Sequence, residues 1–172
     1  EFRRVLFRSR QLKPALRSNP PPTPSAQPTV NSPEYERVAA SLARQGMMRP
    51  LGVRLLRAER GLVELAMPYG EQVTQQQGGF HGGAMGALAD IAGGYAGLTV
   101  LPEGMEIVTV EYKINFLAPA FGEQLVGRGR VVRPGRTLFV CEADIYAVAS
   151  GKETHVARMG TTMMAIADSK KH

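Results

Sequence analysis

The chain of 172 residues contains one cysteine, no tryptophan and few aromatic residues, which make up 6% of it. With Cys141 alone no disulfide can form within the chain, and we expect a reducing, cytoplasmic compartment. A stretch of about 18 uninterrupted apolar residues is also missing, which excludes an ordinary membrane-spanning helix. Since no segment repeats, a fibrous or solenoid architecture is excluded as well.

The composition is that of a folded domain. Hydrophobic residues make up 44% of the chain and charged residues 21%, which is close to the average for globular proteins. Because domains usually contain about 100–200 residues, we expect one domain.

The formal net charge of +6 is concentrated at the beginning of the chain. Residues 1–17 hold six basic residues and one acidic residue, a net +5, which leaves +1 for residues 18–172. A nearly neutral body lacks the basic surface that nucleic-acid binding requires. We therefore expect neither a nucleic-acid partner nor a membrane partner.

Residues 1–32 have the composition of an extension outside the folded domain. The opening is rich in arginine, as in a targeting peptide, but Leu6–Ser9 also resembles a translated sequencing adapter. A membrane-surface helix would need a longer amphipathic pattern. Of the three interpretations we favour the non-native adapter. Residues 18–33 hold six prolines, which is typical of an extended linker, and the domain is expected over residues 33–172.

The remaining sequence predicts an α+β fold with an antiparallel sheet around a central helix. Ser32 is a plausible N-cap for a helix over residues 33–45. Residues 83–101 are apolar almost throughout, which predicts a long buried helix. Strands are predicted over residues 51–58, 62–67, 106–117, 123–132, 137–149 and 153–165. Since strands and helices do not alternate, we expect no parallel sheet.

A histidine and two glycines, His81-Gly82-Gly83, stand at the start of the long helix. Glycine lets the backbone approach a ligand and leaves the first N–H groups of a helix unblocked. Those groups, at the positive end of the helix dipole, suit a carbonyl that becomes an oxyanion. The alternative is that the glycines only form a tight turn.

Asp90 is the single charged residue of the long helix. Burial of an unpaired carboxylate is unfavourable, so its presence in an apolar helix predicts a function. Glycines share its helix face and leave a groove that a substrate or another chain can enter; they are Gly83, Gly86, Gly93, Gly94 and Gly97. The alternative is an aspartate bonded to a local donor, with glycines that permit close helix packing.

The spacing of Gly82 and Asp90 predicts a site shared between two chains. Eight residues of helix span about 12 Å along the axis. A reacting carbonyl must lie about 3 Å from its donor and close to the attacking group. If both residues act, Asp90 must come from a second subunit, most simply in a twofold dimer.

Three stretches resemble a known family: HGGAMGALAD, VTVEYKINFLAPAFGE and VVRPGRTLFVCEADIY. They are similar to the hotdog-fold acyl-CoA thioesterases of the phenylacetate-pathway (PaaI-like) type, over about residues 45–165. The resemblance implies a long central helix wrapped by a curved antiparallel sheet, and subunits that join as a dimer or a dimer of dimers. It also implies hydrolysis of a coenzyme A thioester without a cofactor.

The resemblance also implies catalytic roles. The N–H of Gly82 would polarise the thioester carbonyl, and Asp90 of the neighbouring subunit would act as general base or nucleophile. His81 would order the loop or contact the thioester sulfur. Gln75 stands six residues before His81, where the family often has asparagine, and would orient the nucleophile or water. Thr109 matches a family Ser/Thr that could hold the attacking water, although a threonine is also an ordinary strand residue.

Substrate contacts are expected at several further positions. Gly83, Phe80 and Met85 are the candidates beside the helix start, and Leu88, Tyr95 and Phe116 could also line an acyl pocket. The family resemblance weakly favours medium or long acyl chains over an aromatic acyl group. Arg133 and Arg136 flank the Pro134-Gly135 turn and could bind the phosphates of coenzyme A, unless that turn is simply solvated.

No metal site is expected, because His81, His155 and His172 lack metal-ligand spacing. Cys141 lies in an apolar strand, where packing is the simpler role.

Two other functions remain open from the sequence. A hotdog dehydratase would pair an active-site histidine with a carboxylate, but such enzymes lack the His-Gly-Gly pattern at the helix start. A non-catalytic acyl-CoA-binding domain would serve as a sensor and would normally carry a DNA-binding helix pair. Residues 1–45 offer at most one helix, which favours the hydrolase.

Overall fold

The computed structural model describes residues 32–167, so that the predicted extension lies almost entirely outside the described residues. The elements follow one another in the order α1 (Pro33–Leu42), β1 (Arg54–Glu59), β2 (Leu62–Pro68), η1 (Glu71–Val73), α2 (Gly82–Leu98), β3 (Met105–Phe116), β4 (Gln124–Arg133), β5 (Leu138–Ala149) and β6 (Lys152–Ala167). Neither described α-helix combines the length and the apolarity needed to cross a membrane.

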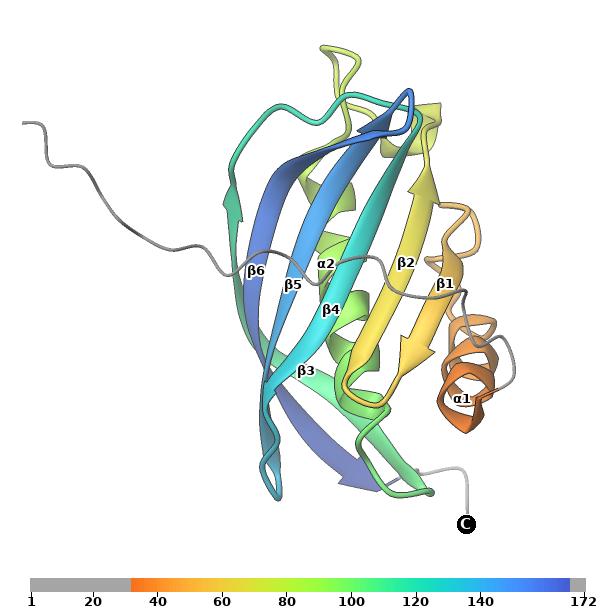
Figure 1. The fold of residues 1–172 in the computed structure, drawn as a ribbon, viewed down its shortest axis with the longest axis vertical. Helices are drawn as coiled ribbons and strands as arrows, with labels where there is room; N and C mark the ends of the chain where they lie inside the picture. The colour runs from red at the N-terminus through yellow and green to blue at the C-terminus, as the bar shows by residue number, and fades with distance from the viewer. Residues whose placement is uncertain (1–31, 168–172) are drawn as a thin grey trace, which may run out of the picture.

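The six strands form one antiparallel sheet in the order β1-β2-β4-β5-β6-β3. The sheet curves around α2, which lies along its concave face (Figure 1). It does not close into a barrel, so β1 and β3 are its edge strands. The predicted hotdog fold, both helices and all six strands are therefore confirmed.

Helix α1 begins as predicted but ends earlier. The Ser32 hydroxyl accepts a hydrogen bond from the N–H of Tyr35, and Pro33 occupies the first helical position. The helix ends at Leu42 rather than residue 45. The next residues make tighter bonds to the third residue back, as between the Gln45 N–H and the Leu42 carbonyl at 3.0 Å.

Strand β1 also begins later than predicted, at Arg54 rather than residue 51. The residues before it form a turn that ends at Gly52, whose φ of 66° favours glycine. The N–H of Gly52 donates to the Arg49 carbonyl at 3.0 Å, so this stretch is not available for sheet pairing.

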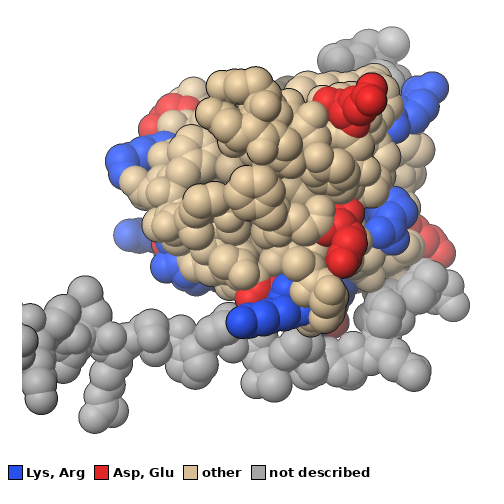
Figure 2. Space-filling model, turned by 90° about the horizontal axis from the view of Figure 1, so that it is seen from above, with Lys and Arg blue, Asp and Glu red and all other residues tan. Residues whose placement is uncertain are grey.

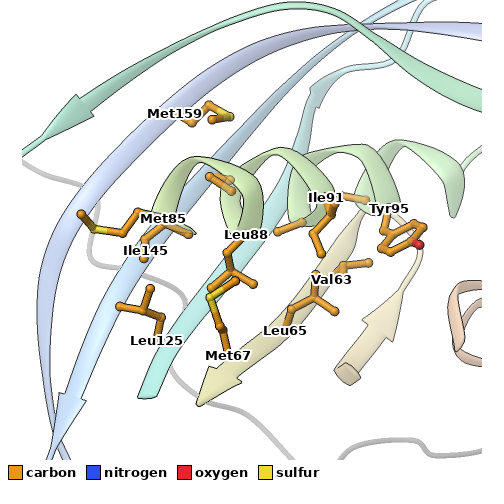
Figure 3. Packing of buried hydrophobic residues seen from close by; sticks show 14 of the residues in the cluster. Val63, Leu65, Met67, Met85, Leu88, Ile91, Tyr95, Leu125, Ile145 and Met159 are labelled. Atoms are coloured by element: carbon orange, nitrogen blue, oxygen red, sulfur yellow. The ribbon is translucent and has the colours of Figure 1, made fainter. Parts of the chain in front are cut away.

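Helix α2 forms the centre of the core, which explains why its sequence is apolar on nearly every face. Figure 3 shows Leu88, Ile91 and Tyr95 of α2 directed toward the residues of β2, including Val63 and Leu65. Helix α2 and strand β4 pack closely because β4 has glycine at position 129, where a methyl group would collide with the backbone of Ala92.

Helix α2 starts one residue earlier and ends three residues earlier than predicted. It ends at Leu98 because Thr99 bonds locally: its hydroxyl donates to the Ala96 carbonyl at 2.6 Å and accepts from the Gly61 N–H at 2.7 Å. The second bond also fixes the end of α2 to the β1–β2 turn. Apolar residues continue to Leu101, and for this reason the hydrophobic pattern overestimates the length of the helix.

The convex face of the sheet carries ion pairs. Arg128 of β4 makes two hydrogen bonds to Glu153 of β6, at 2.7 and 2.8 Å. Arg158 pairs in the same way with Asp144 at 2.7 and 2.9 Å, and Nε2 of His155 lies 2.7 Å from the same carboxylate. These charges are therefore neutralised within the chain and lie on the face opposite α2.

Candidate active site

His81 caps the start of α2 with its side chain. Its backbone is extended, with φ −70° and ψ 140°, and its Nδ1 accepts a hydrogen bond from the Gly83 N–H at 2.8 Å. Its carbonyl accepts from the N–H groups of Ala84 and Met85 at 3.0 and 3.1 Å. His81 thus joins the loop to the first turn of α2 through both its side chain and its carbonyl.

The Gly82 N–H is left unpaired by this cap. Among residues 32–167 no acceptor bonds to it, whereas the next three N–H groups of the helix all have partners within the cap. The phenyl ring of Phe116 lies beside Gly82, since a methyl group on the glycine would stand 3.1 Å from it. A free N–H at a helix start, next to a ring that is 54% exposed, is suited to a polarised carbonyl on an apolar ligand.

Asp90 is held from the neighbouring strand. The hydroxyl of Thr109 on β3 donates to Oδ1 of Asp90 at 2.8 Å. The carboxylate is only partly buried, so its second oxygen can accept a proton or contact a reactant. The structure therefore brings Asp90 and Thr109 together, and Thr109 orients the carboxylate directly.

A β-bulge in β3 places Thr109 and Phe116 on the same side of the sheet. Thr109 is paired with Met163, but Glu111 is paired with Thr162, so β3 contains one extra residue at this point. Side chains alternate along a regular strand, and two residues seven positions apart would face opposite sides. Because the bulge absorbs one residue, both Thr109 and Phe116 face α2.

The glycines of α2 do not share one role. Gly93 and Gly97 are packed against the sheet, where added methyl groups would meet Thr161 and Ile107. A methyl group on Gly94 would make ordinary contact with Met163, at 3.5 Å. The predicted groove along the whole glycine face is therefore wrong for its second half, where the alternative of close packing holds. Gly86 alone of these positions has no atom within 4 Å of an added methyl group.

Gln75 lies in a tight loop before α2. Its backbone N–H donates to the Gly79 carbonyl and its carbonyl accepts from the Gly78 N–H, both at 2.9 Å. The hydroxyl of Tyr69 also donates to the Gly78 carbonyl at 2.9 Å, and its ring packs edge-on against Phe80. Neither contact of Tyr69 follows from a sequence pattern, because both depend on the end of β2 lying beside this loop.

Several expected substrate contacts are buried in the core of the single chain. Phe80 is 1% exposed and Met85 is 6% exposed. Leu88 and Tyr95 are also buried, and burial raises the pKa of Tyr95, whose hydroxyl accepts a hydrogen bond from Gln45 at 2.8 Å. Of the residues predicted to line an acyl pocket, Phe116 is the one that the described chain exposes.

The arginines predicted to bind phosphate lie far from Gly82 within one chain. Arg133 ends β4 and Arg136 follows in the β4–β5 turn, and both are exposed. This turn is at the end of the sheet near Gly61, where α2 ends, while Gly82 is at the end where α2 begins. Within one subunit they cannot serve the Gly82 site, although a partner could bring them to it.

Cys141 is fully buried beneath Gly97, and burial raises the pKa of its thiol to about 11. A neutral buried thiol is a poor nucleophile, so its structural placement fits packing. Within residues 32–167 no three His, Cys, Asp or Glu side chains group as metal ligands do.

The end of the molecule at which α2 begins carries few charges. Figure 2 shows this end, with acidic and basic residues mainly around the rim. Its exposed apolar side chains include Phe116, Leu117 and Phe121, each more than half exposed. Two surface hollows, of about 310 and 400 Å³, lie elsewhere, beside α1. A ligand bound at Gly82 would therefore meet an apolar surface.

Comparison with known proteins identifies the family. Residues 77–154 match the model of the thioesterase superfamily. A solved structure of a thioesterase family protein from Silicibacter pomeroyi is 43% identical, with a TM-score of 0.76, over 78% of this chain and 98% of that one. Proofreading thioesterase EntH of Klebsiella pneumoniae is 31% identical over 69% of this chain and 85% of its own length. Acyl-coenzyme A thioesterase 13 of Homo sapiens is 31% identical over 68% of this chain and 84% of its own length.

The fold and these comparisons thus identify a hotdog-fold thioester hydrolase. The chain belongs to the thioesterase superfamily, as its sequence stretches indicated.

Proposed function

We propose that this protein hydrolyses acyl-coenzyme A thioesters to a free acid and coenzyme A. The observation that supports the proposal is the unpaired N–H of Gly82 at the start of α2. The same helix carries Asp90, whose carboxylate accepts a hydrogen bond from Thr109. The resemblance to human acyl-coenzyme A thioesterase 13 supports the substrate class, since that relative is named for it.

In the proposed reaction the thioester carbonyl accepts a hydrogen bond from the Gly82 N–H. Asp90 either removes a proton from an attacking water or attacks the carbonyl carbon itself. In the first case the water oxygen bonds to the carbonyl carbon, the C–S bond breaks, and the thiolate takes up the proton that Asp90 removed. In the second case the C–S bond breaks to leave an acyl–Asp90 anhydride and a thiolate, and water then hydrolyses the anhydride, which releases the acid, restores the Asp90 carboxylate and supplies the proton for the thiolate. The hydrogen bond to the carbonyl oxygen strengthens as negative charge develops on it, so it accelerates the reaction.

Two chains are required to assemble this site. Gly82 and Asp90 are eight residues apart in one straight helix, or about 12 Å along its axis, which is too far for one carbonyl. We therefore propose a homodimer, alone or as half of a dimer of dimers, in which each site combines Gly82 of one chain with Asp90 of the other. Edge strand β3, with its free hydrogen-bonding groups, is the natural place for the contact.

The remaining details of the substrate are proposed from the sequence motifs and from the chemistry of the exposed side chains. We propose a medium-chain, long-chain or aromatic acyl group, held near Phe116, and coenzyme A phosphates bound by Arg133 and Arg136 of the partner chain. Gln75 would orient the nucleophile or the water. A single buried cysteine and a coenzyme A substrate fit a cytoplasmic location.

The direct test is hydrolysis of a panel of acyl-CoA substrates, with release of the thiol as the readout. The variant Asp90→Asn should lose a factor of about 10² or more in kcat, because the amide is neither base nor nucleophile. Asp144→Asn is the matched control, since it makes the same change on the convex face, and it should retain kcat. Wild-type protein without hydrolysis of any substrate, or an Asp90→Asn variant with full kcat, would contradict the proposal.

A further inference from the structure

Gly86 of α2 is a buried glycine that faces an unfilled space. Less than a tenth of it is exposed, yet an added methyl group would have no atom within 4 Å. Most buried positions are closely packed, so space at a buried residue is unusual. Glycine also disfavours a helix interior, which makes this position costly for the fold unless it serves another purpose.

The position of Gly86 places this space beside Gly82, the part of the proposed site that the same chain supplies. Gly86 is four residues after Gly82 and four before Asp90, so that the three residues lie on one helix face about one turn apart. Gly82 contacts Phe116 and Asp90 contacts Thr109, both on β3. The space over Gly86 therefore lies between these two contacts, against the edge strand.

The second half of α2 shows that glycine content alone does not create such a space. Gly94 stands four residues after Asp90, as Gly86 stands four before it, yet a methyl group there would contact Met163 at 3.5 Å. Gly93 and Gly97 are close to the sheet. The opening is thus specific to the half of the helix that starts at the free N–H.

We infer that Gly86 is a specificity-determining residue, which gives room to the acyl carbons next to the thioester carbonyl. The carbonyl oxygen must lie at the Gly82 N–H, so the first acyl carbons can extend one helix turn along α2. Phe116 forms an apolar wall beside them. The inference rests on the proposed function, and it predicts that side-chain bulk at residue 86 selects against bulky acyl groups.

The test compares Gly86→Ala and Gly86→Leu with the matched control Gly94→Ala. We expect Gly86→Leu to lower kcat/KM at least about tenfold more for dodecanoyl-CoA or benzoyl-CoA than for acetyl-CoA, as pocket contacts of a few methylene groups do. Gly86→Ala should give a smaller change in the same direction. Gly94→Ala should leave the ratio among the substrates unchanged. Circular dichroism and thermal melting confirm that each variant is folded.

Two results would overturn the inference while leaving the thioesterase proposal intact. One is an equal loss, or no loss, for all acyl groups in both Gly86 variants. The other is dissociation of the oligomer by Gly86→Leu, seen by light scattering, because the space would then be filled by the second chain. Gly86→Ala keeps the test valid if the leucine variant fails to fold.

Binding of non-hydrolysable acyl-CoA thioethers separates this inference from the proposed function. The wild-type protein could hydrolyse no acyl-CoA and still bind the dodecanoyl thioether. If Gly86→Leu then weakens this binding more than it weakens binding of the ethyl analogue, Gly86 selects the acyl group in a non-catalytic protein. If the wild type neither hydrolyses nor binds, both proposals fall.

Discussion

The Nδ1 atom of His81 accepts a hydrogen bond from the N–H of Gly83 at 2.8 Å. An accepting nitrogen carries no proton, so the neutral ring carries its proton on Nε2. The Nε2–H remains as a donor on an exposed side chain. By occupying Gly83, the imidazole also determines that Gly82 has the free N–H.

The first prediction concerns this cap. His81→Ala should lower the free energy of unfolding by about 1 kcal/mol, because the Gly83 N–H loses its acceptor. His81→Asn should restore most of it, since asparagine is a good N-cap. Urea denaturation measures both. Equal destabilisation by the two variants would contradict the capping role. A loss of kcat in His81→Asn, although its cap is restored, would assign a further role to the Nε2–H.

A mixed dimer should recover activity that neither parent has. Gly82→Pro removes the free N–H and suits the structure, because proline is favoured at the first helical position and His81 has the extended backbone that it requires. Asp90→Asn removes the carboxylate. Random exchange makes half of the dimers mixed, each with one complete site of two, so about a quarter of wild-type activity should return.

Two controls accompany this experiment. Each variant must be folded and must exchange subunits, which differently tagged chains can show by co-purification. The ring of Phe116 must also shift slightly to admit the proline. Inactive mixed dimers of verified composition would mean that Gly82 and Asp90 do not act across an interface.

Arg37 should contribute strongly to stability. From α1 its guanidinium donates to the carbonyls of Leu101, Pro102 and Met105 at 2.7, 3.1 and 2.6 Å, and so closes the connection between α2 and β3. Arg37→Lys replaces the two spread nitrogens that reach these carbonyls by a single one, and it should lower the free energy of unfolding by about 2 kcal/mol. Arg49→Lys, on the exposed surface, is the control and should have almost no effect.

Cys141 should be protected from alkylation in the native protein. Because burial raises the pKa of its thiol to about 11, the group is neutral and inaccessible at pH 8, and iodoacetamide should modify it only after unfolding. The same shift makes stability fall as pH rises from about 9 to 11, since the unfolded thiol ionises first. Rapid alkylation of folded protein, measured by mass spectrometry, would contradict this burial.

The element types were predictable because the hydrophobic pattern determines them locally. The unbroken apolar run around Asp90 indicated a buried helix, and Ser32 before Pro33 indicated the start of α1. The ends were less accurate where polar side chains bond to the backbone. Thr99 is an example, because its bond to Gly61 depends on a turn 38 residues away.

The site was predictable only in part. Gly82 and Asp90 could be found from their spacing and chemistry along one helix. The proximity of Thr109 to Asp90 was not evident from the residues, since it requires β3 to lie beside α2 at the far edge of the sheet. The position of Phe116 depends in addition on a bulge, which no alternation of side chains reveals. The predicted groove along the glycine face was wrong for the second half of α2, because the division into packed and open halves depends on tertiary distances.

The contact between Gly129 and the backbone of Ala92 has a consequence for motion. With no room for a methyl group between them, α2 cannot roll or slide along the sheet without separating from β4. The amides in the middle of α2 should therefore be among the slowest to exchange hydrogen in the described chain. The helix therefore holds Gly82 and Asp90 of one chain at a fixed separation.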